Sequence, residues 1–303
     1  MTTNLPRVAV IGLGSMGAGM AGSCLRAGLE TTGTDVNPEA IARFTEAGGR
    51  GAPDAATAVA EADIVVSVVV NAQQTEAVLF GEGGIAGAMR PGAVFVSSAT
   101  MDPAVARRLA ARLEATGRHY LDAPISGGAA RAAKGELTIM ASGSGEAFSA
   151  ARPALEAMAV KVYELGEAAG TGAAFKMINQ LLAGVHIAAA CEAMTLAAKQ
   201  GLDLRRVYEV ITASAGNSWM FENRMPHVLE GDYRPASAVE IFVKDLGIVQ
   251  DMARSERYPV PLAAASLQMY LAAAGAGMGR DDDSSLARLY AQLSGAELPE
   301  RKA

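Results

Sequence analysis

Short apolar runs rich in β-branched residues alternate with helical patterns through the first 122 residues. The clearest runs are Val8–Ile11, Leu29–Thr34, Ile64–Val70, Ala93–Ser97 and His119–Asp122. Helical segments of about 10–15 residues separate them, and strands separated by such helices form right-handed βαβ units with a parallel sheet. This alternation predicts an α/β domain whose central strands are covered on both faces.

The second half of the chain loses this alternation. A helical pattern starts at Gly170–Gly172 and continues to about Gln200, and the sequence after it indicates only helices and turns. We therefore expect an N-terminal domain over residues 1–166 and an all-helical domain over residues 167–303. Because no low-complexity linker separates them, the long helix should join the domains directly.

The composition excludes several classes of protein. Half of the 303 residues are hydrophobic and 19% are charged, which excludes a disordered chain. The net charge is −6, whereas a nucleic-acid-binding protein usually carries a basic surface, so the sequence argues against that class. Cys24 and Cys191 are far apart and the histidines are widely spaced, which argues against a disulfide scaffold or a metal site.

The same evidence bears on location. The apolar stretch Met177–Cys191 contains Asn, Gln and His, and it falls short of the about 20 apolar residues that a membrane span needs. The N-terminus has no charged segment followed by an apolar one, so we see no signal peptide. We expect a cytoplasmic protein with no membrane partner.

A glycine-rich motif follows the first apolar run directly. The segment Gly12-Leu13-Gly14-Ser15-Met16-Gly17 matches G-x-G-x-x-G and opens the first helical pattern. The first glycine permits a tight turn, the second lets the backbone approach a pyrophosphate, and the third lets helix and strand pack closely. The helix N-terminus offers its N–H groups to the phosphates. The motif, placed between a strand and a helix, predicts a Rossmann-type dinucleotide site.

An acidic residue stands where a ribose would bind. Asp35 lies 23 residues after Gly12, at the end of the second apolar run. A carboxylate there accepts hydrogen bonds from the ribose hydroxyls and repels a 2′-phosphate. The nearest arginine beyond it is Arg43, so the sequence favours NAD over NADP. The alternative is a glycine-rich turn beside a surface aspartate.

A second polar segment, Asp122–Gly128, follows the last predicted strand. Its Ser126-Gly127-Gly128 portion exposes a hydroxyl and consecutive N–H groups, which suit a carboxylate. Ligands of open α/β sheets bind at the carboxyl ends of the strands, where this segment lies. From the residues alone, an ordinary glycine-rich loop is an equally good interpretation.

Lys176 is the most informative single residue. Between residues 168 and 198 the only charged residues are Lys176 and Glu192, so this apolar helix should be buried over most of its surface. Asn179 and Gln180 follow at i+3 and i+4 and share its face. An apolar setting favours the uncharged amine, which can accept a proton at neutral pH. The alternative is a snorkelling or salt-bridged lysine.

Lys244-Asp245 is a third candidate. The pair follows the apolar stretch Val239–Val243. A solvated Lys–Asp pair at a helix start is the alternative interpretation.

Together these segments resemble the β-hydroxyacid dehydrogenase family, which includes 3-hydroxyisobutyrate dehydrogenase and tartronate semialdehyde reductase. The resemblance spans nearly the whole chain, and it rests on Gly12–Gly17, Asp122–Gly128, Gly172–Asn179 and Lys244–Leu246. Four motifs in this order are far more specific than the glycine loop alone. The resemblance implies a Rossmann domain followed by an all-helical domain that binds substrate and forms a homodimer or homotetramer.

The resemblance also implies roles for residues near the substrate. Lys176 would be the catalytic acid/base, and Asn179 would hold substrate oxygens. The substrate carboxylate would bind Ser126, Gly127 and Gly128.

Three further residues would lie near the cofactor. Lys244 would stand beside both cofactor and substrate, and Thr100 would contact the nicotinamide. Asn71, at the end of the preceding strand, matches a cofactor-contact position less securely.

Within the family, the segments 180–188, 215–225 and 239–246 look most like those of L-threonate dehydrogenases. The resemblance thus implies NAD-dependent oxidation of a small hydroxy acid, with L-threonate as the first candidate. Oxidation at C2 would give 2-dehydro-L-erythronate. The alternatives are a 3-hydroxyisobutyrate dehydrogenase, a tartronate semialdehyde reductase and, outside enzymes, a nucleotide-sensing regulator.

Overall fold

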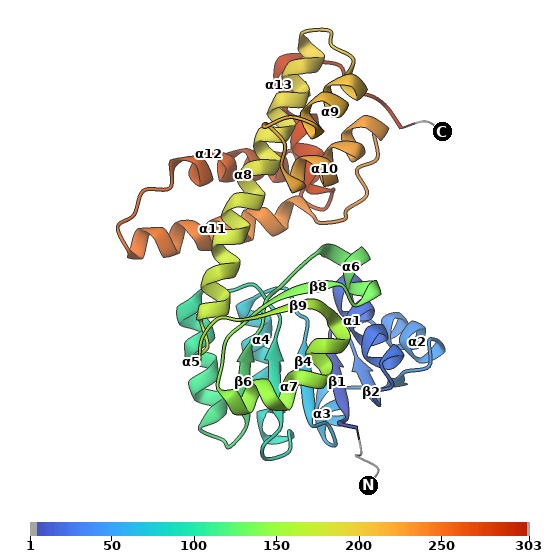
Figure 1. Ribbon diagram of the computed structural model, residues 1–303, viewed down its shortest axis with the longest axis vertical. Coiled ribbons are helices and arrows are strands. Elements are labelled where there is room, and N and C mark those ends of the chain that lie inside the picture. The colour runs from blue at the N-terminus through green and yellow to red at the C-terminus, as the bar shows by residue number, and fades with distance from the viewer. Residues whose placement is uncertain (1–4, 302–303) are drawn as a thin grey trace. The chain divides into compact units, whose positions relative to one another are not determined.

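The computed structural model describes residues 5–301 (Figure 1). The chain forms two compact units, which divide between Lys176 and Met177 inside the long helix α8 (Thr171–Lys199). Each unit has its own hydrophobic core.

The first unit is built on a six-stranded parallel sheet with the order β3-β2-β1-β4-β5-β6. Its strands are β1 (Val8–Ile11), β2 (Thr31–Thr34), β3 (Arg50–Gly51), β4 (Ile64–Ser67), β5 (Val94–Ser97) and β6 (His119–Asp122). Its helices are α1 (Ser15–Arg26), α2 (Pro38–Glu46), α3 (Ala55–Val59), α4 (Ala72–Phe80), the 3₁₀ turn η1 (Ile85–Gly87) and α5 (Pro103–Glu114). The predicted α/β fold with a parallel sheet is confirmed.

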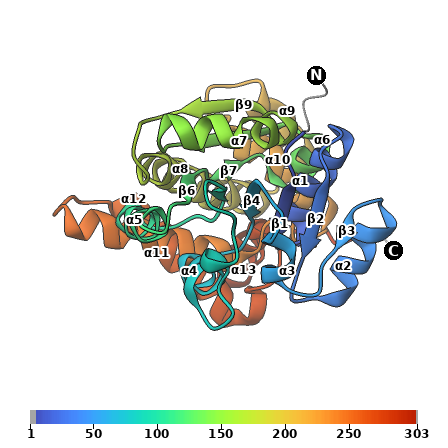
Figure 2. The ribbon, with the colours of Figure 1, turned by 90° about the horizontal axis from the view of Figure 1, so that it is seen from below.

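The central strands are apolar because both faces of the sheet are covered. Every residue of β1, β4 and β5 is buried. Successive residues of β1 enter different cores: Val8 and Val10 pack with residues of α1 and α7, and Ala9 and Ile11 with residues of α3, α4 and α5. Figure 2 shows these two sets of helices on opposite faces of the sheet. A doubly wound sheet results, with its strand order reversing between β1 and β4.

One strand is shorter than the sequence predicts. The apolar run Ile64–Val70 was expected to be extended throughout, but β4 ends at Ser67. Asn71 therefore does not end a strand: it is the N-cap of α4, and its side chain accepts a hydrogen bond from the backbone N–H of Gln74 at 2.8 Å. Gln74 in turn accepts the N–H of Val70 at 2.8 Å. These capping bonds turn the chain out of the sheet earlier than hydropathy alone indicates.

A second, smaller sheet follows β6 and has no counterpart among the predicted elements. It contains β7 (Ile125–Ser126), β8 (Leu137–Ala141) and β9 (Ala159–Glu164), with α6 (Gly128–Lys134) and α7 (Gly145–Met158) between them. β7 is antiparallel to β8, whereas β8 and β9 are parallel. A backbone bridge between Asp122 and Ser142 links this sheet to the end of β6.

The second unit is helical throughout the described residues, as expected. It contains the remainder of α8, then α9 (Leu204–Thr212), α10 (Trp219–Glu230), α11 (Val239–Ser255), α12 (Pro261–Ala273), the π-helical turn η2 (Ala274–Met278), the 3₁₀ turn η3 (Asp283–Ser285) and α13 (Leu286–Ser294). By length and composition α8 could cross a membrane, but core helices pass the same test. Its buried residues Met177, Ile187, Cys191 and Met194 belong to the core of this unit.

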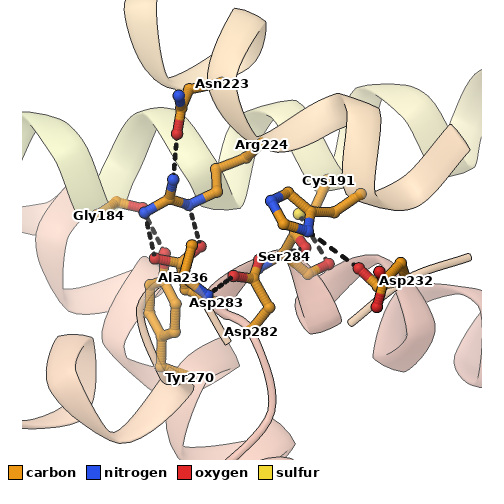
Figure 3. Close-up of polar contacts among 11 residues, drawn as sticks. Gly184, Cys191, Asn223, Arg224, Asp232, Ala236, Tyr270, Asp282, Asp283 and Ser284 are labelled. Carbon is orange, nitrogen blue, oxygen red and sulfur yellow. Dashed lines mark hydrogen bonds and ion pairs between the residues drawn. The ribbon is translucent and has the colours of Figure 1, made fainter. Parts of the chain in front are cut away.

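A buried polar cluster orders that core (Figure 3). Arg224 Nε donates to Asp283 Oδ1 at 2.6 Å, and Nη2 lies 3.3 Å from Oδ2, with the aspartate fully buried. Asp282 accepts the backbone N–H of Ala236 at 2.8 Å and the hydroxyl of Ser284 at 2.6 Å. These bonds fix the turn before α13 against α10, because buried carboxylates are stable only when paired.

Candidate active site

The glycine loop between β1 and α1 is held by close backbone contacts. Gly12 has φ +92°, and a Cβ there would lie 2.6 Å from the carbonyl oxygen of Val68. A Cβ on Gly17 would collide with the carbonyl oxygen of Gly12. Both positions therefore require glycine, as the motif predicts.

Gly14 is different, because no atom lies within 4 Å of the position its Cβ would take. It is the N-cap of α1 and has no side chain to cap the helix. The N–H groups of the first turn, including those of Ser15 and Met16, have no intrahelical acceptor. The space beside Gly14 and the helix N-terminus therefore suit the pyrophosphate of a dinucleotide.

Asp35 follows β2, beside this loop. Its Oδ2 accepts the backbone N–H of Leu13 at 2.6 Å, and its Oδ1 accepts that of Asn37 at 2.8 Å. A carboxylate has about four acceptor positions, so these bonds leave capacity for ribose hydroxyls. Arg43, the nearest following arginine, lies 3.8 Å from Glu39 on the same helix. The residues present therefore fit NAD.

Two expected cofactor contacts lie at the carboxyl ends of neighbouring strands. Thr100 is half-buried three residues after β5, and Asn71 caps α4 after β4. Since β1, β4 and β5 are adjacent, both residues share the sheet edge with the glycine loop.

The expected carboxylate-binding segment also begins at this edge. Ser126 ends β7 opposite Thr138 of β8, and Gly127 and Gly128 follow with φ of +137° and +75°. Gly127 is the N-cap of α6, which packs on α1: a Cβ on Gly19 would lie 2.7 Å from the backbone N of Ala133. The glycine loop and the Ser126–Gly128 segment therefore open two helices that are packed together.

The start of α8 is bound to the end of β6. Asp122 is 1% exposed, and its Oδ2 accepts the N–H groups of Gly170 at 2.9 Å and Ala173 at 2.8 Å. Ser142 Oγ donates to the same oxygen at 3.3 Å and accepts the N–H of Gly172 at 2.9 Å. Lys176 follows one turn later and is 7% exposed. The helix as a whole is less buried than predicted, because Phe175 and Ile178 on either side of Lys176 are 53% and 54% exposed.

In the second unit, a chain of polar contacts connects α8 with α11. Asn179 Nδ2 donates to Gln180 Oε1 at 2.9 Å, and Gln180 Nε2 donates to Asp245 Oδ2 at 2.5 Å. Lys244 Nζ lies 2.9 Å from Asp245 Oδ1. Because Asp245 is 1% exposed, this pair is not the solvated one that the alternative interpretation proposed. The structure thus brings Asn179 and Lys244 into one network.

Three residues of these networks, Asp122, Ser142 and Gln180, had no assigned role in the sequence analysis. Asp122 and Gln180 lie inside recognised motifs, and the signal for both was a polar residue in an apolar context. Val36, just after Asp35, is fully exposed. Within residues 5–301, no group of three or more His, Cys, Asp and Glu residues could hold a metal ion.

Three features define the first unit as an NAD-binding domain. They are the doubly wound sheet, the glycine loop with open space beside Gly14, and the acidic residue Asp35 after β2. With a buried lysine at the start of the following helix, they place the chain in the class of NAD-dependent dehydrogenases.

Comparison with known proteins narrows this class. Residues 7–166 match the family model of the NAD binding domain of 6-phosphogluconate dehydrogenase, and residues 170–290 match that of the NAD-binding region of NADP-dependent 3-hydroxyisobutyrate dehydrogenase. The chain belongs to the 3-hydroxyisobutyrate dehydrogenase-like family of β-hydroxyacid dehydrogenases, and it is an NAD-dependent hydroxy acid dehydrogenase.

Individual relatives cover almost the whole chain. It is 55% identical to the L-threonate dehydrogenase of Cupriavidus necator, over 96% of this chain and 97% of the relative. It is 51% identical to the L-threonate dehydrogenase of Escherichia coli K12, over 97% of each. A crystal structure of 3-hydroxyisobutyrate dehydrogenase from Salmonella typhimurium superposes with a TM-score of 0.90 at 50% identity, over 94% of this chain and 100% of that one.

Proposed function

We propose that the enzyme oxidises L-threonate at C2 to 2-dehydro-L-erythronate, with Lys176 as the acid/base. The observation that carries the catalytic part is the burial of Lys176 on α8, one turn before Asn179. The substrate is supported by the 55% identity with the L-threonate dehydrogenase of Cupriavidus necator over nearly the full length of both chains.

In this mechanism, bound NAD supplies the acceptor for the hydride that leaves C2. The chain supplies the proton acceptor: the amine of Lys176 takes the hydroxyl proton as the C2–O bond becomes a carbonyl. Oxidation thus sends a hydride, which is one proton with two electrons, to the nicotinamide, and the hydroxyl proton goes to Lys176. In the reverse direction, the ammonium of Lys176 returns that proton to the carbonyl oxygen.

Orientation comes from both ends of the substrate. The hydroxyl of Ser126 and the N–H groups of Gly127 and Gly128 hold the carboxylate; the positive φ of both glycines supports this role, because an anion can approach a backbone without Cβ atoms. Asn179 holds substrate oxygens, and its bond to Gln180 fixes the orientation of the amide.

The remaining proposed contacts are on the cofactor side. The pyrophosphate binds at Gly12–Gly17, the adenosine ribose at Asp35 and the nicotinamide portion near Thr100, with Asn71 a further contact. Lys244 stands beside cofactor and substrate, and its ion pair with Asp245 limits the positions its ammonium can take.

The second candidate is a 3-hydroxyisobutyrate dehydrogenase, and tartronate semialdehyde reductase is a related one. The 50% identity with the Salmonella typhimurium 3-hydroxyisobutyrate dehydrogenase favours the former. L-Threonate and 3-hydroxyisobutyrate both carry a carboxylate and would both give their hydroxyl proton to Lys176, so the proposed residues do not discriminate between these two substrates. The difference lies in the extra hydroxyl groups of a four-carbon sugar acid.

The experiment measures the rate of NAD reduction with each member of a panel of substrates. L-Threonate, its stereoisomers, 3-hydroxyisobutyrate and glycerate are compared by kcat/KM. The highest value is expected for L-threonate, whereas a strong preference for 3-hydroxyisobutyrate would replace the substrate assignment and leave the role of Lys176 in place.

We also propose a division of labour and an assembly. Residues 1–166 bind NAD, and residues 167–303 complete the substrate site and join subunits into a homodimer or homotetramer. Exposed large apolar side chains on the helical unit support association, including Leu196, Leu262 and Leu293 at 60%, 70% and 72% exposure. Light scattering should give a multiple of the 31.0 kDa chain mass, and the single-chain mass at micromolar concentration would contradict it.

A cytoplasmic location is supported by the two buried free cysteines.

A further inference from the structure

Asp122 stands where three parts of the first unit meet. It is the last residue of β6, and the Ser126–Gly128 segment starts four residues after it. Its backbone N–H donates to the carbonyl of Ser142 at 3.0 Å, and its carbonyl accepts the N–H of Ser142 at 2.8 Å. Its side chain accepts hydrogen bonds from the backbone N–H groups of Gly170 and Ala173 at the start of α8. One residue therefore links the main sheet, the second sheet and the helix that carries Lys176.

The contact with α8 uses a single oxygen. Gly170, Ala173 and the hydroxyl of Ser142 all donate to Oδ2, whereas Oδ1 is buried and has no hydrogen-bond partner among the described residues. The first N–H groups of a helix have no intrahelical acceptor, so this oxygen supplies what the helix lacks. Because Asp122 and Ser142 are 1% and 0% exposed, water cannot readily replace it.

The helix also packs unusually close at this point. A Cβ on Gly172 would collide with the carbonyl oxygen of Met140 and would lie 3.0 Å from that of Asp122. The backbone of α8 thus touches the ends of β6 and β8 directly. Lys176 lies three residues beyond Ala173, about 4.5 Å further along the axis. A shift of the first turn would therefore move the amine by a similar amount.

We propose that Asp122 is a positioning residue: its Oδ2 holds the first turn of α8 against β6 and so fixes Lys176 relative to the Ser126–Gly128 segment. The inference rests on the acid/base role proposed for Lys176. A displacement of about 1 Å in a reacting group can cost about 10²-fold in rate, so such an anchor matters even without contact to substrate.

The single-oxygen geometry makes the anchor depend on an acceptor and not on a charge. A proton on Oδ1 leaves Oδ2 free to accept all three bonds. Asn at this position can place its amide oxygen where Oδ2 stands, whereas Ala leaves two buried N–H groups without an acceptor. The Asn variant should therefore rescue what the Ala variant loses.

The first measurement uses the protein without any ligand. Hydrogen–deuterium exchange of the amides of residues 170–176 is compared in wild type, Asp122→Ala and Asp122→Asn. Exchange should accelerate at least tenfold in the Ala variant and less than threefold in the Asn variant. Asp203→Ala is the matched control, because Asp203 accepts the N–H groups of Arg205 and Arg206 at the start of α9. It should leave exchange at residues 170–176 unchanged.

The second measurement is kcat per folded molecule with L-threonate, or with the best substrate of the panel, beside NAD affinity by calorimetry. Asp122→Ala should lower kcat about 10- to 100-fold with NAD affinity within threefold of wild type. Asp122→Asn and Asp203→Ala should stay within threefold in both. A purely structural role would lower the yield of folded enzyme and leave kcat per folded molecule unchanged.

Ser142→Ala keeps the test decisive if Asp122→Ala does not fold. It removes the acceptor of the Gly172 N–H and should accelerate local exchange and lower kcat about 3- to 10-fold. Wild-type exchange and kcat in the Ala variants, or an Asp122→Asn variant as impaired as Asp122→Ala, would overturn the proposal. Wild-type turnover in Lys176→Ala would instead refute the acid/base role, and the positioning role with it, while the exchange results would still report on the anchor.

Discussion

Asp35 Oδ2 accepts the backbone N–H of Leu13 at 2.6 Å, so the carboxylate after β2 holds the glycine loop at its second residue. The same carboxylate is the group proposed to bind the adenosine ribose. Its two tasks differ in what they need: the loop requires an acceptor oxygen, whereas discrimination against a 2′-phosphate requires a negative charge. Substitutions at Asp35 can separate them.

Asp35→Asn should keep the bond to Leu13 through its amide oxygen and lose the charge, while its NH2 replaces the oxygen that accepts the N–H of Asn37. We expect wild type to prefer NAD over NADP by tenfold or more, equivalent to ~1.4 kcal/mol, and Asp35→Asn to lose most of that preference. Asp35→Ala should relax the preference and also weaken both nucleotides, because the loop loses its tether. Affinities from calorimetry test this, and a wild-type enzyme that prefers NADP would refute the role given to Asp35.

Gly14 and Gly17 should respond differently to alanine. Gly14→Ala meets no protein atom within 4 Å, so its free energy of unfolding should change by less than about 1 kcal/mol. Its methyl group would occupy the space proposed for the pyrophosphate, so NAD affinity should fall at least tenfold. Gly17→Ala collides with Gly12 and should lower stability as well. Normal NAD binding by a stable Gly14→Ala variant would argue against the proposed cradle.

Gly172→Ala tests the close approach of α8 to β8 without removing a polar group. The new methyl group collides with the carbonyl oxygen of Met140, so the first turn must move away from the sheet. We expect kcat to fall about tenfold or more, with NAD affinity nearly unchanged. Gly145→Ala, in the first turn of α7, meets nothing within 4 Å and is the control. Equal kcat values for the two variants would show that this approach is irrelevant to catalysis.

Asp122 should also shape the dependence of stability on pH. Burial raises the pKa of Asp122 to about 6, although hydrogen bonds from Ala173, Gly170 and Ser142 and the charge of Arg107 oppose the shift. The folded protein therefore keeps a proton between about pH 4 and 6 that the unfolded chain releases. The resulting stabilisation is complete below about pH 4 and is lost as the pH rises through 6.

Relative to Asp122→Asn, the free energy of unfolding of wild type should thus fall by up to about 3 kcal/mol between pH 4 and 7.5. Urea unfolding of both proteins across this range measures it. The comparison of wild type with Asp54→Asn should change in the opposite direction, so that wild type gains stability relative to this variant as the pH rises. The reason is that the hydrogen bond from the backbone N–H of Thr57 lowers the pKa of the exposed Asp54. A constant difference between wild type and Asp122→Asn would contradict the raised pKa of Asp122.

Much of the first unit could be predicted because its strands are buried on both faces. Apolar runs such as Val8–Ile11 then mark the strands without ambiguity, and glycines at fixed spacing mark the turn after β1. The second sheet was missed because its strands are short or half-exposed: β9, Ala159–Glu164, has no buried residue. The end of β4 was misplaced because Asn71 and Gln74 override hydropathy, a capping signal that three-residue spacing could have revealed.

Part of the candidate site could likewise be predicted from the sequence, and part of it could not. Lys176 and Asn179 were found because polar residues are rare on an apolar helix. The role of Asp122 could not be inferred from sequence, because its partners are backbone N–H groups 48 and 51 residues away. The bond between Gln180 and Asp245, 65 residues apart, likewise depends on tertiary packing.

The central claim is that Lys176 moves the proton, and kcat of Lys176→Ala and Lys176→Arg beside NAD affinity tests it most directly. Both variants should lose at least about 10²-fold in kcat, because neither methyl nor guanidinium can accept the hydroxyl proton, and both should bind NAD as wild type does. Near-normal turnover in Lys176→Arg would show that the residue supplies only charge, and loss of NAD binding in Lys176→Ala would show that its role is structural.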